Sequence, residues 1–297
     1  GSGRGYLTVW DAFSGDRAQT FLRDGGPAHD GFIRDVVFSP DGALLASASG
    51  GVGGPGDQTV RVWDVASGAE VVSVESPDGA MWSFLGETPQ LAFHPDSAHL
   101  AITGFQEEAA RILNVATGEW DQELVGAGSP ARGVRYLADG TRIATSAAYG
   151  SIALWDTATG NHLFSVTLES AAARLLLFDV SPDGSKLAAT SDDGSIRVWN
   201  LQDNQGPPAM RLHASDIPMG IAFSPDGRHV VSAARFLRKP DQPGELKVWD
   251  LATAQETFRL PVEGGLVSSV AFSPDGQRIV ASSFNPTKAD QSGAIDI

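Results

Sequence analysis

Cysteine is absent from the 297-residue sequence, so neither a disulfide framework nor a thiolate metal site is available. The absence fits a reducing compartment, and we expect a cytoplasmic protein. Long apolar runs are absent as well: stretches such as residues 175–178 have the length of a strand, whereas a membrane-spanning helix needs about 18 apolar residues. Residues 1–4 lack the apolar segment of a signal peptide. We therefore expect neither a membrane span nor a secretory leader.

Positive charge is scarce. Lys and Arg number 21 against 36 Asp and Glu, which gives a net charge of −15. An acidic surface repels nucleic-acid phosphates and anionic lipid headgroups, so we expect neither nucleic acid nor a membrane as partner. Only four basic residues are lysines, at positions 186, 239, 247 and 288, and this preference for Arg points to a GC-rich bacterial genome.

The sequence also lacks the motifs of common catalytic sites. No G-x-S-x-G, H-E-x-x-H or P-loop motif occurs. The six histidines never pair at ligand spacing within one strand, so neither a metal site nor a cofactor is predicted. They are His29, His94, His99, His162, His213 and His229. The segment Asp192-Asp193-Gly194 is interpreted as a hairpin turn, because it lacks the further oxygens of a calcium loop. These absences predict a protein that is not an enzyme.

What the sequence does contain is an internal repeat, which is sought before local structure is assigned. The turn Ser-Pro-Asp-Gly occurs at residues 39–42 and recurs three more times, with two degenerate copies. The further copies begin at Ser181, Ser224 and Ser273, and the degenerate copies begin at His94 and Leu137. In this turn Pro presets φ, Asp bonds the local backbone and Gly takes the left-handed position. His94 is interpreted as the replacement of the serine in one such turn.

A second marker, an apolar residue followed by Trp and then Asp or Asn, runs in phase with the turn. Its tryptophans stand at positions 10, 63, 155, 199 and 249, and Leu113 holds the same place in a unit without Trp. These six positions are 42 to 53 residues apart, which is the range expected for propeller blades. Two independent markers with one period predict a chain of repeated blades.

Each unit is predicted to hold four short strands, named a to d in chain order. In the unit over residues 30–75 they are 33–38, 44–47, 59–63 and 70–74. Gly, Pro and Asp at every boundary leave no room for helices of about ten residues. Four-stranded sheets repeated radially form a β-propeller, so the predicted fold class is all-β. Each Trp is expected to fill the space between neighbouring blades.

These residues resemble the WD40-repeat family. The Trp-Asp ending, the following Ser-Gly or Thr-Gly and the Phe-Ser-Pro-Asp-Gly turn all match it, over essentially the whole chain. The resemblance implies a WD40-type β-propeller that acts as a non-catalytic scaffold or sensor and binds a protein or peptide. Residues 1–297 are interpreted as a single domain, a segment of a larger bacterial polypeptide with an incomplete closing blade. A seven-bladed parent is favoured, because six a–b pairs accompany seven c strands, and a six-bladed ring is the alternative.

The family often carries a buried His–Ser/Thr–Asp–Trp tetrad of hydrogen bonds that joins the strands of a blade. The resemblance implies such a structural tetrad of His29, Ser47, Asp57 and Trp63, and only this blade has all four members. The first three could also be taken for a hydrolase triad. The structural interpretation is preferred, because these residue types without a grooved site do not make a catalyst.

Function is placed on the connecting loops, because a rigid scaffold positions them. The d–a and b–c loops of a propeller share one face, and four unusual insertions fall there, over residues 50–56, 76–89, 235–240 and 284–292. Aromatic residues and Arg on such loops are typical of protein-binding hot spots. The predicted partner-binding residues are Trp82, Phe84, Phe105, Tyr149, Arg235, Phe236, Arg238, Lys239 and Phe284. In an alternative interpretation, Trp82 and Phe84 tuck under their own loop as a small core.

Two further functions stay open. The chain could be the accessory propeller of a hydrolase, as in TolB-like or prolyl-oligopeptidase-like proteins, although the Trp-Asp and Thr-Gly pairing argues against it. A small ligand could instead bind in the central channel, for which Arg34, Arg132, Asp179 and Ser268 are the candidates. The sequence names neither the partner nor the oligomeric state.

Overall fold

The computed structural model describes residues 5–50, 57–75, 90–104, 110–125, 131–147, 150–168, 174–202, 208–214, 216–235, 244–262, 266–284 and 293–296. Within these ranges every regular element is a β-strand. The described part of the chain accordingly has no helix with the length and apolar character needed to cross a membrane. The predicted all-β fold class is confirmed.

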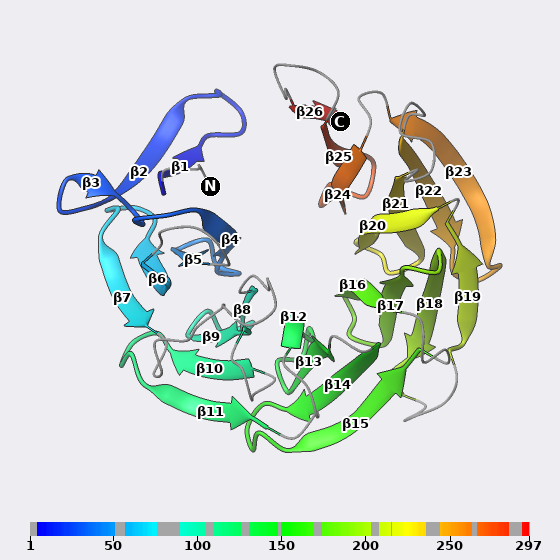
Figure 1. Cartoon of the computed structure of the whole chain (residues 1–297), viewed down its shortest axis with the longest axis horizontal. Coiled ribbons are helices and arrows are strands. Elements are labelled where there is room, and N and C mark those ends of the chain that lie inside the picture. Colours follow the sequence, from blue (N-terminus) through cyan, green and yellow to red (C-terminus); the bar gives the residue numbers. More distant parts are fainter. Residues whose placement is uncertain are drawn as a thin grey trace. The chain divides into compact units, whose positions relative to one another are not determined.

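The described strands form seven sheets, which follow one another along the chain from blue to red in Figure 1. Five sheets have four strands in the order a-b-c-d, with antiparallel neighbours. Their strands are β4 (Ile33–Phe38), β5 (Leu44–Ser49), β6 (Thr59–Asp64) and β7 (Glu70–Glu75); β8 (Leu91–Phe93), β9 (His99–Ile102), β10 (Ala110–Asn114) and β11 (Trp120–Leu124); β12 (Ala131–Tyr136), β13 (Arg142–Ala147), β14 (Ser151–Asp156) and β15 (His162–Thr167); β16 (Leu175–Val180), β17 (Lys186–Ser191), β18 (Ser195–Asn200) and β19 (Met210–His213); and β20 (Ile217–Phe223), β21 (His229–Arg235), β22 (Gly244–Asp250) and β23 (Gln255–Val262).

The first and last sheets have three strands each. The last consists of β24 (Leu266–Phe272), β25 (Ile279–Phe284) and β26 (Gly293–Asp296), in the places of a, b and c. The first consists of β1 (Leu7–Trp10), β2 (Arg17–Arg23) and β3 (Gly26–Pro27). The described strands thus include the six a–b pairs and seven c strands expected from the sequence. The blade count itself, seven or six, stays a prediction.

The short strand β3 is not foreseen by the repeat. It follows β2 after a two-residue hairpin turn in which Asp24 and Gly25 both have positive φ, 51° and 79°. Two consecutive positive φ angles define a type I′ turn, for which Asp-Gly is a favoured sequence. The repeat analysis missed it because β3 is only two residues long.

The chain forms two compact units, which are described separately. The first comprises Gly1–Tyr136, Gly140–Ala147 and Ala153–Leu163, and the second comprises Leu137–Asp139, Ala148–Ile152 and Phe164–Ile297. The interpretation of residues 1–297 as a single domain stays a prediction.

The repeated turn has the local chemistry expected from its sequence. The Ser39 hydroxyl donates to Asp41 Oδ1 at 2.6 Å and accepts the backbone N–H of Leu44 at 2.8 Å. Asp41 Oδ1 also accepts the backbone N–H of Ala43 at 3.0 Å, and Gly42 has φ of 73°. The Ser and Asp side chains therefore accept hydrogen bonds from backbone N–H groups that the turn would otherwise leave unpaired. Gly avoids the strain of a side chain at positive φ.

In the first unit, the c-strand residue of a sheet packs against the sheet before it. Trp63 of β6 lies in one core cluster with Phe21 of β2, and their ring centroids are 5.7 Å apart. Trp155 of β14 lies in another cluster with Ala101 of β9. Leu113 of β10, which stands where other units have Trp, is fully buried in a third cluster with residues of β5 and β6. The expectation that this position fills the space between neighbouring sheets is confirmed for Trp63 and Trp155 and holds for Leu113, but it is wrong for Trp10, which is 62% exposed.

The second unit repeats this arrangement. Trp249 of β22 shares a cluster with Ala188 and Val198 of the preceding sheet β16–β19. The following contact between sheets involves Gly220 of β20, which packs closely against β24. A Cβ built on Gly220 would lie 3.0 Å from Val270 Cγ1 of β24 and 3.1 Å from the Cβ of Ala233. Both units are thus held together by apolar contacts from sheet to sheet.

Candidate interaction surface

The connections of each complete sheet leave from two different ends. In sheet β20–β23, Ile217 at the start of strand a pairs with Arg235 at the end of strand b, and Gly244 at the start of c pairs with Val262 at the end of d. The b–c and d–a connections therefore share one end, which we call the loop end. The a–b and c–d turns share the other end, which we call the turn end.

The longest connections lie at the loop end, although residues 192–194 form a short one there and residues 201–209 form a nine-residue connection at the turn end. At the turn end, residues 39–43 separate β4 from β5, and residues 251–254 separate β22 from β23. At the loop end, residues 76–90 separate β7 from β8, and residues 236–243 separate β21 from β22. Long connections on a rigid scaffold are where binding residues concentrate.

All nine predicted partner-binding residues belong to connections at the loop end or border them. Arg235 ends β21 and Phe284 ends β25, but their side chains lie outside the described part of the structure. The other seven residues lie in connections outside the described ranges: Trp82, Phe84, Phe105, Tyr149, Phe236, Arg238 and Lys239. Their partner-binding role stays a prediction, as does the alternative core of Trp82 and Phe84.

The loop end of sheet β4–β7 also holds a buried chain of hydrogen bonds. Trp63 Nε1 donates to Ser47 Oγ at 2.9 Å, and Ser47 Oγ lies 2.8 Å from His29 Nε2. His29 Nδ1 lies 3.1 Å from both Asp57 Oδ1 and Thr59 Oγ1. The structure thus brings the four tetrad residues into one chain of contacts. Ser47 and His29 are fully buried, and Ser47 accepts from an indole, so the arrangement ties strands together and does not present a nucleophile to a substrate.

Asp57 is the anionic end of that chain and carries two further ion pairs. Arg61 Nη2 lies 3.1 Å and Arg23 Nη1 3.4 Å from Asp57 Oδ2. The same two guanidinium groups also reach outward, Arg23 to Asp30 at 2.7 Å and Arg61 to Glu70 at 2.6 Å. Burial would raise the pKa of Asp57, but the hydrogen bond and charge of His29 and the charge of Arg61 outweigh it and hold the pKa well below its usual value. Asp57 is therefore an anion at neutral pH.

Other sheets keep parts of the tetrad. Trp155 Nε1 donates to Thr145 Oγ1 at 2.8 Å, and Trp249 Nε1 donates to Ser232 Oγ at 3.1 Å. In sheet β16–β19, Ala189 stands at the position of this serine. The indole N–H of Trp199 therefore has no hydroxyl acceptor at that position. These blades rely more on apolar packing between sheets.

Two of the four candidates for a small-ligand site, Arg34 and Asp179, are engaged with the protein backbone. Arg34 Nε donates to the carbonyl of Gly50 at 2.8 Å, and Asp179 Oδ2 accepts the backbone N–H of Phe223 at 2.9 Å. Arg132 is exposed, and the side chain of Ser268 lies outside the described part. These contacts position strands and connections, and ligand binding by these residues stays an alternative prediction.

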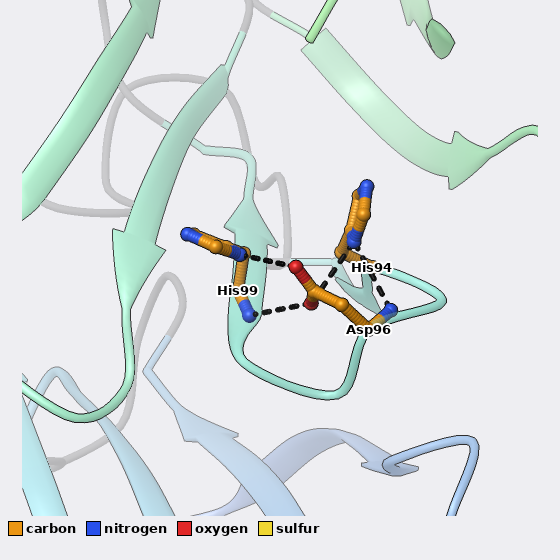
Figure 2. A group of neighbouring side chains, drawn as sticks. All are labelled: His94, Asp96 and His99. Carbon is orange, nitrogen blue, oxygen red and sulfur yellow. Dashed lines mark hydrogen bonds and ion pairs between the residues drawn. The ribbon is translucent and has the colours of Figure 1, made fainter. Parts of the chain in front are cut away.

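A cluster of titratable side chains lies at the turn end of sheet β8–β11, in the hairpin between β8 and β9 (Figure 2). Asp96 lies between two imidazoles: its Oδ1 is 2.9 Å from His94 Nδ1, and its Oδ2 is 2.7 Å from His99 Nδ1. Burial would raise the pKa of Asp96, but the backbone N–H of Ala98 and the two histidines outweigh it and lower the pKa to about 2. At neutral pH an anion therefore lies between two rings.

This cluster was missed by the sequence reasoning, which considered histidine spacing within single strands. His94 and His99 stand on opposite sides of the turn, and the hairpin pairs them, because the backbone N–H of His94 donates to the carbonyl of His99 at 2.9 Å. The sequence does contain a pattern that could have predicted the cluster. In the spacing His-Pro-Asp-x-x-His, the two histidines stand at the first and last positions of one tight turn, which brings their imidazoles together.

Comparison with known proteins identifies the repeats. The family described as WD domain, G-beta repeat, matches residues 20–64, 173–200 and 255–287. The chain is 27% identical over 173 residues to the WD repeat-containing protein SL1-17 of Schistosoma mansoni, covering 58% of this chain and 52% of that protein. It is 27% identical over 219 residues to transducin beta-like protein 3 of Mus musculus, covering 71% of this chain and 25% of that protein. It is 26% identical over 266 residues to periodic tryptophan protein 2 of Arabidopsis thaliana, covering 88% of this chain and 26% of that protein.

The chain thus spans about half the length of the first of these relatives and about a quarter of the other two. All three are eukaryotic proteins, so they lend no support to the bacterial origin inferred from the preference for Arg. The family match at residues 20–64 contains the complete tetrad, and the match at residues 173–200 contains both the Ser-Pro-Asp-Gly turn and the Trp199 ending. Repeat period, four-stranded sheets and the family match at three segments agree that the chain contains repeats of the WD40 type.

Proposed function

We propose that this chain is a non-catalytic scaffold or sensor module that binds a protein or peptide at the loop end of its sheets. The observation that carries the proposal is the difference between the two ends. Most turn-end connections have four to six residues, with residues 201–209 between β18 and β19 as the exception. The longest connection, residues 76–90, is at the loop end, and all nine predicted binding residues belong to loop-end connections or border them. In a propeller this end of every blade contributes to one face.

The chemistry of the loop connections fits a protein partner. Trp82, Phe84 and Phe236 supply aromatic surface, and Arg238 with Lys239 adds cations to a chain whose net charge is −15. Aromatic residues and Arg carry most of the binding energy in protein interfaces. The acidic charge disfavours nucleic acid and anionic membranes as partners.

The test compares two triple variants of the full chain in affinity capture and quantitative binding to each captured protein. The first variant carries Trp82→Ala, Phe236→Ala and Arg238→Ala, all at the loop end. We expect at least one interaction to weaken about 100-fold or more, because loss of hot-spot residues costs several kcal/mol.

The matched control carries Glu119→Ala, Arg228→Ala and Gln277→Ala, which are exposed residues in turns at the turn end. We expect the control to bind as the unchanged chain does. If every interaction survives the loop-end variant, or if the control loses the same interactions, the proposed face is wrong.

We further propose that the protein works in the cytoplasm. The support is the complete absence of cysteine, which fits a reducing compartment. Fractionation of cells that express the protein from its own gene tests this, and recovery from a secreted or membrane fraction would contradict it.

A further inference from the structure

We propose that the β8–β9 hairpin binds one Zn²⁺ ion through His94 Nδ1, the Asp96 carboxylate and His99 Nδ1 (Figure 2). Imidazole nitrogen and carboxylate oxygen are ordinary zinc ligands, and three protein ligands with a water in the fourth position form an open tetrahedral site. This site is independent of the proposed partner surface, because it lies at the turn end.

The ligand atoms are already gathered. The two nitrogen–oxygen distances are 2.9 and 2.7 Å, and all three ligand atoms lie within 4.8 Å of one another. Ligands bound tetrahedrally at 2.0–2.1 Å are about 3.3 Å apart. Binding therefore requires the two nitrogen–oxygen contacts to open by roughly half an ångström, and any wider pair, at most 4.8 Å apart, to move closer, which exposed ends of side chains can do without a change of fold. The side chains of His94, Asp96 and His99 are 22%, 39% and 32% exposed, so an ion can reach them.

The other nitrogen of each ring fixes which nitrogen is free to bind the ion. His94 Nε2 lies 2.9 Å from the carbonyl oxygen of Gly140, and His99 Nε2 lies 3.1 Å from Asp121 Oδ2. Both partners are acceptors, so in each ring Nε2 can hold the proton while Nδ1 binds the ion. Metal-binding histidines characteristically donate their second N–H to a backbone carbonyl or a carboxylate, which are the two partners found here.

The Nδ1 atoms of His94 and His99 both face oxygens of the Asp96 carboxylate, at 2.9 and 2.7 Å. Without metal, a proton on His99 Nδ1 makes the hydrogen bond to Asp96 Oδ2, and Zn²⁺ would take the place of that proton. The backbone N–H of Asp96 donates to His94 Nδ1 at 3.1 Å, which agrees with an unprotonated Nδ1. Asp96 Oδ1 also accepts the backbone N–H groups of Ala98 at 2.8 Å and His99 at 3.2 Å. Zn²⁺ between the three side chains would replace these close contacts with three metal–ligand bonds.

The hairpin holds the ligands in place before binding. The His94 ring packs edge-on against Tyr136, with centroids 4.9 Å apart and an interplanar angle of 90°. The backbone hydrogen bond from His94 to His99 fixes the distance between the two strands at the base of the turn. Ligands that are already oriented lose less entropy on binding.

Another hairpin of the same chain serves as an internal comparison. His229 stands where His99 does, with Asp226 in the place of Asp96, but Ser224 stands where His94 does. There His229 Nδ1 is 4.0 Å from Asp226 Oδ1, and the serine hydroxyl donates to that same oxygen at 2.5 Å. In the part of the chain that the structure describes, only the β8–β9 hairpin gathers three such ligands. The replacement of serine by His94 is thus what completes the set.

The test is zinc binding by the tag-free full chain, stripped of metal with a chelator that is then removed. ZnCl₂ is titrated by calorimetry, and we expect one ion per chain. His94→Ser restores the residue found in the other turns, so the hairpin is expected to fold, and the affinity for Zn²⁺ should fall about 100-fold or more. His99→Lys, which copies Lys186 at the same place in another turn, should have the same effect, and His229→Gln should have none.

A second measurement identifies the ligand atoms. In two-bond ¹H–¹⁵N spectra of the histidine rings, Zn²⁺ should shift Nδ1 of His94 and His99 and leave their Nε2 atoms protonated. Asp121→Asn, which weakens the acceptor behind His99, should lower the affinity about 10- to 100-fold. The proposal is overturned if the chain takes up no Zn²⁺, if His94→Ser binds it as tightly as the unchanged chain, or if the ion binds through Nε2.

Discussion

The indole N–H of Trp63 donates to the hydroxyl of Ser47 across 2.9 Å, with both side chains fully buried. Trp is a donor only, so the serine oxygen accepts, and its own proton is free for His29 Nε2 at 2.8 Å. His29 Nδ1 then donates toward Asp57. The polar atoms of the tetrad therefore form one directed chain, from indole to carboxylate.

Ser47→Ala is expected to lower the free energy of unfolding by about 2–3 kcal/mol, because it leaves two buried groups, the Trp63 N–H and His29 Nε2, without a partner. Urea titration measures the change. Ser232→Ala is the matched comparison, since Ser232 accepts only the indole of Trp249 among the contacts described, at 3.1 Å. The unfolding free energy lost by Ser232→Ala should be smaller, about 1 kcal/mol. Equal losses in the two variants would show that the contact to His29 contributes nothing.

Trp155→Ala is expected to cost about 3–5 kcal/mol, the range for a buried aromatic side chain, because it opens a cavity between β14 and the preceding sheet. Trp155 is 0% exposed, whereas Trp10, at the same place in the repeat, is 62% exposed. Trp10→Ala is therefore the control and should change stability by less than about 0.5 kcal/mol. An unchanged urea midpoint for Trp155→Ala would contradict the role of the indole as a spacer between sheets.

The strands and turns could be predicted from the sequence because their chemistry is local. Ser39, Asp41 and Gly42 need only each other to reverse the chain, and the observed bonds and positive φ are those expected. The strand boundaries in the unit from β4 to β7 agree with the expected ones to within two residues. The place of Trp63, Trp155 and Trp249 between sheets followed from the period together with the family resemblance, whereas the exposure of Trp10 did not.

Contacts across the chain were harder to predict. Ser47 and His29 are 18 positions apart, and Asp57 and His29 are 28 apart, so the tetrad came from the resemblance and not from spacing. The His94–Asp96–His99 cluster was missed for the opposite reason, because the two rings meet through a hairpin and the spacing was considered within single strands. A partner surface depends on how long connections fold, and neither period nor turn chemistry determines that.

Because of Asp57, the stability of this blade is expected to fall at acidic pH. Its folded-state pKa lies below the ordinary value of 3.8, so the native state binds fewer protons than the unfolded chain at mildly acidic pH. The stability from Asp57 is therefore fully present above about pH 5, and it is lost as the pH falls through 3.8 toward the lowered pKa. Asp57 is faced by the His29 ring and by the guanidinium groups of Arg23 and Arg61, and the two guanidinium groups keep their charge throughout this range.

Asp57→Asn is expected to be less stable than the unchanged chain at pH 7, because His29, Arg23 and Arg61 lose their shared anion while the side-chain volume is kept. Below about pH 4 the difference in unfolding free energy should shrink steadily, since protonation removes the same anion from the unchanged chain. Other carboxylates titrate alike in both proteins, so the difference isolates Asp57. Ser47→Ala is the control: it weakens the same tetrad but keeps the carboxylate, so its deficit should stay much closer to constant with pH. Urea titrations at pH 7, 5, 4 and 3 measure both, and a deficit for Asp57→Asn that persists unchanged down to pH 3 would show that Asp57 is not held as an anion by its neighbours.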